Sequence, residues 1–158
     1  MHIALVQPEI PGNTGSIGRV CVGTATTLHL VGQLGFSLDE KYVRRAGLDY
    51  WKNVDLRLHV DLDALIATLP ASPLHLFSAH ASVRYDSVAY GPDDVLIFGC
   101  ETKGLPEAIV RRFADRLLYV PTNGRIRSLN LANVATAVLF EALRQQDFGG
   151  MQPRPDPT

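Results

Sequence analysis

Short apolar runs alternate along the chain with segments whose apolar residues recur at helical spacing. The runs are four to seven residues long and are bounded by Pro, Gly, Asp or Asn, which is typical of strands. They are His2–Val6, Leu28–Val31, Val54–Val60, Leu74–Ser78, Val95–Gly99 and Leu117–Val120. Most show no alternation with polar residues, which indicates a sheet that is covered on both faces.

Helical periodicity predicts helices between and after these strands. They span Thr14–Thr24, Leu62–Leu69, Pro106–Phe113 and Leu131–Gln145. Asn13, Asp61 and Asn130 precede three of them at positions suited to an N-cap. The β–α alternation predicts an α/β domain with a mainly parallel sheet of about six strands and helices on both faces.

The chain has 158 residues, and neither an internal repeat nor an interdomain linker divides it. We therefore expect a single domain over residues 1–148. Residues 149–158 include three prolines and two glycines, which predicts a disordered C-terminal tail.

Charge changes this picture only locally. The chain is 46% hydrophobic and 20% charged, which suits a soluble protein with a buried core and excludes disorder. The net charge of −1 gives no overall sign of a nucleic-acid or membrane partner. Residues 101–127, however, contain six basic and three acidic side chains. Three of the 15 basic residues are lysine and the rest are arginine, which suits bidentate recognition of phosphate or carboxylate.

Cysteine usage and the N-terminal segment indicate an intracellular protein. Cys21 and Cys100 are far apart, and each lies among apolar residues, so free thiols in a reducing compartment are expected. No spacing of His, Cys, Asp or Glu suggests a metal site. Because neither a basic leader nor a membrane-spanning run is present, we expect a cytoplasmic protein without membrane association.

The first segment with unusual composition is Pro8–Arg19, PEIPGNTGSIGR, which joins the first strand to the first helix. Its glycines recur every third residue, which is neither a dinucleotide-binding fingerprint nor a phosphate-binding loop. We interpret them as a small helix face that packs closely. Arg19 lies about one turn into a helix whose start could attract an anion, although a solvated arginine is the alternative.

Two further segments follow strands, where ligands gather in open α/β sheets. In Phe98–Pro106, FGCETKGLP, Gly99 and Gly104 could let the backbone approach a ligand, while Glu101 and Lys103 could pair or face solvent.

In Val120–Asn133, VPTNGRIRSLNLAN, several donors lie beside a helix start. We expect Leu129 and Leu131 to pin this loop to the core. Ser128 or Asn130 could simply cap the helix, but Arg125 and Arg127 exceed what a cap requires. In one domain the three segments could converge on one cleft.

The motifs NTGSIGR, FGCETKGLP and RSLNLAN, in this order and spacing, resemble those of the SPOUT class of RNA 2′-O-methyltransferases. The resemblance covers residues 1 to about 147, including the linking segment RRAGLDYW at 44–51. It points to the small branch without an added RNA-binding domain. The resemblance implies a C-terminal deep trefoil knot that binds S-adenosyl-L-methionine (AdoMet), with S-adenosyl-L-homocysteine as product. It further implies a homodimer that methylates the wobble cytidine or uridine in the anticodon loop of tRNA.

Carried over by position, the resemblance assigns the site residues. Cofactor contacts are expected at Ala79, Gly99, Glu101, Gly104, Val120, Ser128 and Leu129. Arg19, Ser128 and Asn130 are the expected catalytic residues, and Arg19 of one subunit should complete the site of the other. A guanidinium has no acceptor, so Arg19 would stabilise an alkoxide or accept a proton only in a strongly desolvated site.

RNA contacts are expected from Arg19, Arg125 and Arg127, with Arg44 and Arg45 near the dimer edge. The chain departs from the family at Phe140, where a phenol is usual, so any role of that hydroxyl is lost.

Two other functions stay open. The same fold could methylate a ribosomal RNA ribose, or it could be a catalytically silent RNA- or cofactor-binding module.

Overall fold

Seven parallel strands form one sheet in the order β3-β2-β1-β6-β4-β7-β5 in the computed structural model, which describes residues 1–38, 50–149 and 151. The strands are β1 (His2–Val6), β2 (Thr27–Val31), β3 (Leu56–His59), β4 (Leu74–Phe77), β5 (Val83–Arg84), β6 (Val95–Phe98) and β7 (Leu117–Tyr119). The helices are α1 (Pro11–Gly23), α3 (Leu62–Thr68), α4 (Glu107–Arg112) and α5 (Leu131–Gln145).

The predicted α/β class and parallel sheet are confirmed, and each predicted strand occurs. The prediction missed β5, because a two-residue edge strand leaves no hydrophobic run to detect. Of the predicted tail, residues 150 and 152–158 lie outside the described residues.

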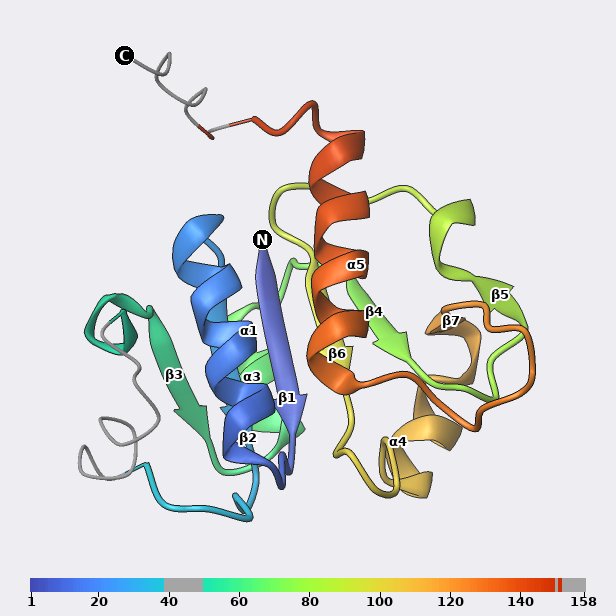
Figure 1. The fold of residues 1–158 in the computed structure, drawn as a ribbon, viewed down its shortest axis with the longest axis horizontal. Helices are drawn as coiled ribbons and strands as arrows, with labels where there is room; N and C mark the ends of the chain where they lie inside the picture. Colours follow the sequence, from blue (N-terminus) through green and yellow to red (C-terminus); the bar gives the residue numbers. More distant parts are fainter. Residues whose placement is uncertain (39–49, 150, 152–158) are drawn as a thin grey trace.

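Helices cover both faces of the sheet (Figure 1). Helices α1 and α5 lie side by side on one face, and α3 and α4 pack on the other. In β1, Ile3 and Leu5 join the core under α1 and α5, while Ala4 and Val6 join the opposite core. The central strands bury mainly apolar side chains on both faces, which explains why most of them do not alternate. Within the described residues, every helix is too short or too polar to span a bilayer.

The starts of the helices show which boundaries can be predicted from neighbouring residues alone. Helix α5 has the predicted bounds, and the Asn130 side chain caps it as expected. Asp61 caps α3 by accepting a bond of 2.8 Å from the Ala64 N–H. The helix predicted over Thr14–Thr24 occurs as α1, but its start and its Asn13 cap were predicted wrongly, because the helix begins at Pro11 and Asn13 lies inside its first turn. Pro11 suits a first turn, since it has no N–H that needs a partner there.

The close-packing interpretation of the glycine repeat holds for Gly18. A Cβ at Gly18 would lie 2.7 Å from the Trp51 ring, so the missing side chain lets this indole pack against α1. At Gly12 a Cβ would meet no atom within 4 Å. Gly12 is therefore not explained by packing.

Both cysteines are free, as predicted, but only Cys21 is fully buried. Burial raises the pKa of the Cys21 thiol to about 12, which keeps it protonated at neutral pH. Cys100 is half-buried directly after β6.

Three histidines form a hydrogen-bonded ladder across β1, β2 and β3. His2 Nδ1 lies 3.1 Å from His29 Nε2, and His29 Nδ1 lies 2.9 Å from His59 Nε2. A neutral imidazole has one donor and one acceptor. Three neutral rings can therefore form both bonds when each donates in the same direction along the ladder. Burial lowers the pKa of all three, and that of the fully buried His29 to about 4. The ladder therefore favours uncharged rings.

The ladder predicts acid destabilisation. An unfolded histidine titrates near 6.5, whereas folded His29 stays neutral until about 4. The unfolded chain therefore binds more protons in this window, and stability falls by about 3 kcal/mol as the pH falls through it. Urea unfolding at several pH values measures the effect. The His29→Gln variant should lose most of this slope, and a variant of the exposed His80, His80→Gln, should retain it. Equal slopes in the wild type and His29→Gln would contradict the assignment.

Candidate functional site

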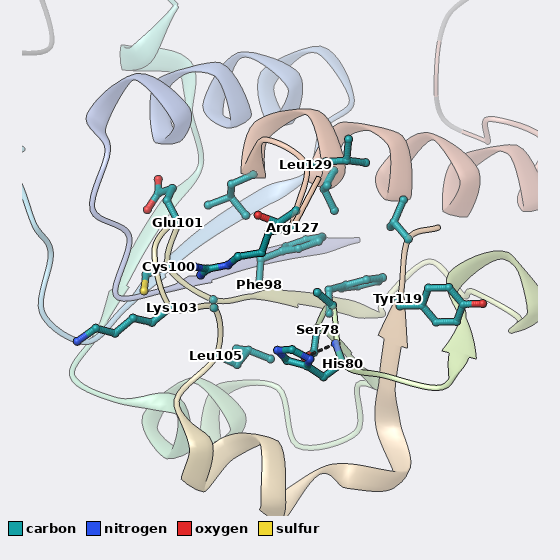
Figure 2. A pocket seen from close by; sticks show the side chains of 18 of the residues that line it. Ser78, His80, Phe98, Cys100, Glu101, Lys103, Leu105, Tyr119, Arg127 and Leu129 are labelled. Atoms are coloured by element: carbon teal, nitrogen blue, oxygen red, sulfur yellow. Dashed lines mark hydrogen bonds between the residues drawn. The ribbon is translucent and has the colours of Figure 1, made fainter. Parts of the chain in front are cut away.

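A cavity of about 1070 Å³ opens at the carboxyl ends of β4, β6 and β7 (Figure 2). Its volume is near the upper end of the range of about 300–1,000 Å³ typical of ligand pockets. The predicted residues that line it are Ala79, Gly99, Glu101, Gly104, Val120, Arg127, Ser128, Leu129 and Asn130. Ile10 and Asn13, from the start of α1, complete one wall. The three segments that the sequence singled out thus meet at one cavity.

The loop after β6 folds back on its own backbone. Cys100 and Gly104 exchange two backbone hydrogen bonds of 3.1 and 3.0 Å, and Gly104 has a φ of +72° that favours glycine. A Cβ at Gly99 would lie 2.0 Å from the Gly104 carbonyl carbon. Gly99 is therefore required by a contact between two stretches of backbone. It also lines the cavity, and its close approach to a ligand stays a prediction.

The Glu101 carboxylate caps the start of α1 from this loop. It accepts hydrogen bonds from the Glu9 N–H at 2.8 Å, the Ile10 N–H at 3.2 Å and the Asn13 amide at 3.0 Å. Helix α1 has no acidic residue in its first turn and no local side-chain cap. Glu101 thus supplies the negative charge that a helix N-terminus favours. Its side chain neither pairs with Lys103 nor faces solvent freely, the two arrangements considered from the sequence.

Asn13 carries this network on to α5. Its side-chain oxygen accepts a bond of 2.9 Å from the Asn130 amide nitrogen. The Asn130 oxygen in turn accepts from the Ala132 and Asn133 N–H groups, at 2.9 and 3.2 Å. One chain of side-chain bonds therefore runs from Glu101 through Asn13 to Asn130 and joins the three segments.

Glu9 returns the contact that Glu101 makes. Its carboxylate accepts from the Thr102 hydroxyl at 2.8 Å and from the Thr102 N–H at 3.2 Å. Each segment thus presents a carboxylate to donors of the other. This exchange holds the start of α1 against the loop after β6.

The loop of residues 121–130 is exposed along its whole length. Leu129 is 42% exposed, so the expectation that it pins this loop to the core was wrong. Arg127 makes the attachment instead, because its guanidinium donates to the Thr102 carbonyl. Figure 2 shows this side chain reaching across the cavity toward the segment that carries Cys100 and Glu101. The Ser128 hydroxyl lines the cavity and has no hydrogen-bond partner among the described residues.

The predicted basic residues lie in different surroundings, and two of them are outside the described residues. Arg19 is exposed and is not among the described residues that line the cavity. Its guanidinium lies over the Tyr50 ring, 4.5 Å from the centroid. Arg125 also lies off the cavity, in a turn where its N–H donates to Asn123. Arg127 is bound to Thr102, as described above. Arg44 and Arg45 lie outside the described residues.

Sequence reasoning missed Glu9, Thr102 and Tyr50, and took Asn13 only as a cap. The polar residues of PEIPGN and CETK do give a hint of this contact. The N–H groups at the start of a helix need acceptors, and α1 has neither a local side-chain cap nor an acidic residue in its first turn. No local pattern, however, identifies which distant side chain supplies it.

The lining chemistry suits an organic ligand with apolar and polar parts. Leu105, Leu118 and Val134 give the cavity apolar walls, while Ser78 and Ser128 bring hydroxyl groups. Among residues 1–38, 50–149 and 151, no group of His, Cys, Asp and Glu is arranged to hold a metal ion.

Comparisons with known proteins agree with this geometry. A tRNA (cytidine(34)-2'-O)-methyltransferase of Methylovorus glucosotrophus is 45% identical over 152 residues, which are 94% of this chain and 97% of the relative. A solved structure described as "Structural insights into the 2-OH methylation of C/U34 on tRNA" has a TM-score of 0.86 and 41% identity, and covers 92% of this chain and 95% of its own.

A more distant solved structure carries the cofactor. This AdoMet-bound rRNA methyltransferase from Sinorhizobium meliloti has a TM-score of 0.78 and 28% identity, and the match covers 90% of this chain and 55% of that one. Residues 1–140 match the SpoU rRNA Methylase family. The family match covers most of the chain, and the Methylovorus glucosotrophus relative is similar to it over nearly the whole length of both proteins. The chain therefore belongs to the SpoU methylase family.

Proposed function

We propose that this protein transfers a methyl group from AdoMet to the ribose 2′-OH of nucleotide 34, a cytidine or uridine, in tRNA. The observation that carries the proposal is the meeting of its three motif segments at one cavity. Its support from comparison is the near-complete match to relatives whose names give this reaction.

The cavity fits AdoMet as the bound cofactor. Ala79, Gly99 and Val120 follow three adjacent strands and would hold the cofactor through backbone groups, beside Gly104 and Leu129. Glu101 would act through the backbone, since its carboxylate is committed to α1. The Ser128 hydroxyl is left available for a ligand. When bound, AdoMet supplies a methyl group that is already activated.

The protein's own task is to position the ribose and stabilise charge. The 2′-oxygen must be held in line with the methyl carbon, and it gains negative charge as its proton leaves. We assign the stabilisation of that charge to the Arg19 guanidinium, which has donors and no acceptor. Asn130 is a positioning residue in this scheme, because its side chain caps α5 and binds Asn13.

The location of Arg19 supports a homodimeric site, in which Arg19 of one subunit reaches the cavity of its partner. Arg19 is exposed and lies off the cavity of its own chain. Helix α5 and its end also expose Phe140 and Phe148, at 43% and 39%, with their rings 6.5 Å apart. We propose that these two rings contact the partner subunit. Phe140 would contribute packing to this contact without a hydroxyl.

The implied trefoil knot belongs to the same proposal. It is supported by the path of residues 121–130 past the loop after β6, to which Arg127 binds through the Thr102 carbonyl. Arg125 is an exposed residue of this segment and is our candidate for contact with RNA phosphates. Arg44 and Arg45 are proposed for the same role from the sequence alone.

A ribosomal RNA substrate is the second candidate, because the matching Sinorhizobium meliloti structure is an rRNA methyltransferase. That structure is 28% identical to this chain, whereas the tRNA enzyme of Methylovorus glucosotrophus is 45% identical. The higher identity favours tRNA.

Nucleoside mapping tests the proposed function. The protein is incubated with labelled AdoMet and either tRNA or rRNA transcripts, and the methylated nucleoside is located. We expect label on the ribose of nucleotide 34 of tRNA. Label confined to rRNA would favour the second candidate, and no label in either RNA would favour a silent binding module.

The Arg19→Ala variant should fold and bind AdoMet as the wild type does, while transferring methyl about 10²–10³-fold more slowly. This is the usual cost of removing one donor that stabilises an oxyanion. Single-turnover rates measure the step. Arg125→Ala is the matched control, which should raise the KM for tRNA and leave the single-turnover rate at saturation intact. A wild-type rate in Arg19→Ala would remove Arg19 from the mechanism.

The Ser128→Ala variant should weaken AdoMet binding by about two- to tenfold, the range for one net hydrogen bond. Calorimetric titration measures the affinity, with Ser72→Ala, which lies off the cavity, as the control. Unchanged affinity in Ser128→Ala would show that this hydroxyl does not touch the cofactor. Substitution of Gly99 is a poor test, because its Cβ would collide with the backbone of the protein itself.

A further inference from the structure

The contact between Arg19 and Tyr50 links the catalytic candidate to a residue without an assigned role. Tyr50 lies 31 positions further along the chain and is half-buried. The Arg19 guanidinium carbon is 4.5 Å from the centre of its ring, well within the distance of a cation–π interaction.

The ring itself is held at a defined place on α1. The Tyr50 hydroxyl donates a bond of 2.6 Å to the Gly15 carbonyl, one turn before Arg19 on the same helix. Its neighbour Trp51 packs against Gly18, which has no side chain to obstruct the indole. Helix α1 thus holds the Tyr50 ring in place through Gly15, and the ring lies under Arg19 of the same helix.

The partner of Arg19 is an aromatic ring and not a carboxylate, and this difference affects its N–H donors. A carboxylate would occupy N–H donors of the guanidinium and neutralise its charge. Among the described residues no carboxylate pairs with Arg19. A ring face attracts the cation without accepting its in-plane N–H bonds, so the donors remain available for an oxyanion or phosphate.

We infer that Tyr50 is a positioning residue for the methyl transfer, which holds the Arg19 guanidinium in place while leaving its charge and donors free. The inference rests on the proposed function and extends it to a residue outside the cavity. The stack restricts the many rotamers of an exposed arginine, so less order has to be gained when the RNA binds.

Variants of Tyr50 separate the ring from the hydroxyl. Tyr50→Leu should lower the single-turnover rate about two- to fivefold, the effect expected for one lost cation–π contact at an exposed site, with the affinity for AdoMet unchanged. Tyr50→Phe retains the ring but loses the hydroxyl bond to Gly15, so its rate should lie between those of the wild type and Tyr50→Leu. In the Arg19→Ala background, Tyr50→Leu should cost nothing further, because Tyr50 acts through Arg19. Arg112→Ala, which removes a guanidinium 4.9 Å from the Phe113 ring, is the matched surface control and should leave the rate unchanged.

A readout without activity keeps the inference separate from the proposed function. The Arg19 side-chain NMR signal should carry a ring-current shift in the wild type and Tyr50→Phe, and lose it in Tyr50→Leu. If the wild type methylates tRNA and Tyr50→Leu does so at the same rate, the inference is overturned. It is also overturned if Tyr50→Leu lowers the rate of Arg19→Ala by the same factor as it lowers the rate of the wild type. Loss of activity in Tyr50→Phe as large as in Tyr50→Leu would also overturn it. If the wild type transfers no methyl group to RNA, the proposed function fails instead, and the NMR signal still reports whether the stack exists.

Discussion

The site depends on one electrostatic contact, that of the Glu101 carboxylate with the start of α1. This helix has no acidic residue in its first turn, and Glu101 provides the missing acceptor and charge from the loop after β6. Because a helix N-terminus carries partial positive charge, the contact is attractive as well as directional. It fixes α1 relative to β6, and with it every residue that α1 carries.

Two consequences follow for the architecture of the cavity. Through Asn13, the same carboxylate is connected to Asn130 and so to the start of α5. The exposed loop of residues 121–130 is therefore anchored at its end by this network and in its middle by Arg127. Helix α1 also carries Arg19, which is exposed and lies off the cavity of its own chain.

Features that depend on neighbouring residues were predicted correctly from the sequence, whereas side-chain contacts between distant segments were missed. Helix α5 was predicted to the residue because its apolar stripe and its cap, Asn130, lie together in the sequence. The start of α1 was wrong because its cap lies 91 positions from Ile10. The convergence of the three segments followed from the parallel topology, since their strands end at one edge of the sheet. Side-chain partnerships such as Arg19 with Tyr50 have no periodicity and could not be anticipated.

A double-mutant cycle between Glu101 and Asn130 tests the central claim most directly, since both side chains bond to Asn13 and the claim is that Asn13 transmits their coupling. The free energies of unfolding of Glu101→Ala, Asn130→Ala and the double variant give the interaction energy. The account predicts a coupling above about 0.5 kcal/mol that disappears when Asn13→Ala is added. Additive effects of the two substitutions would contradict a network that joins the three segments.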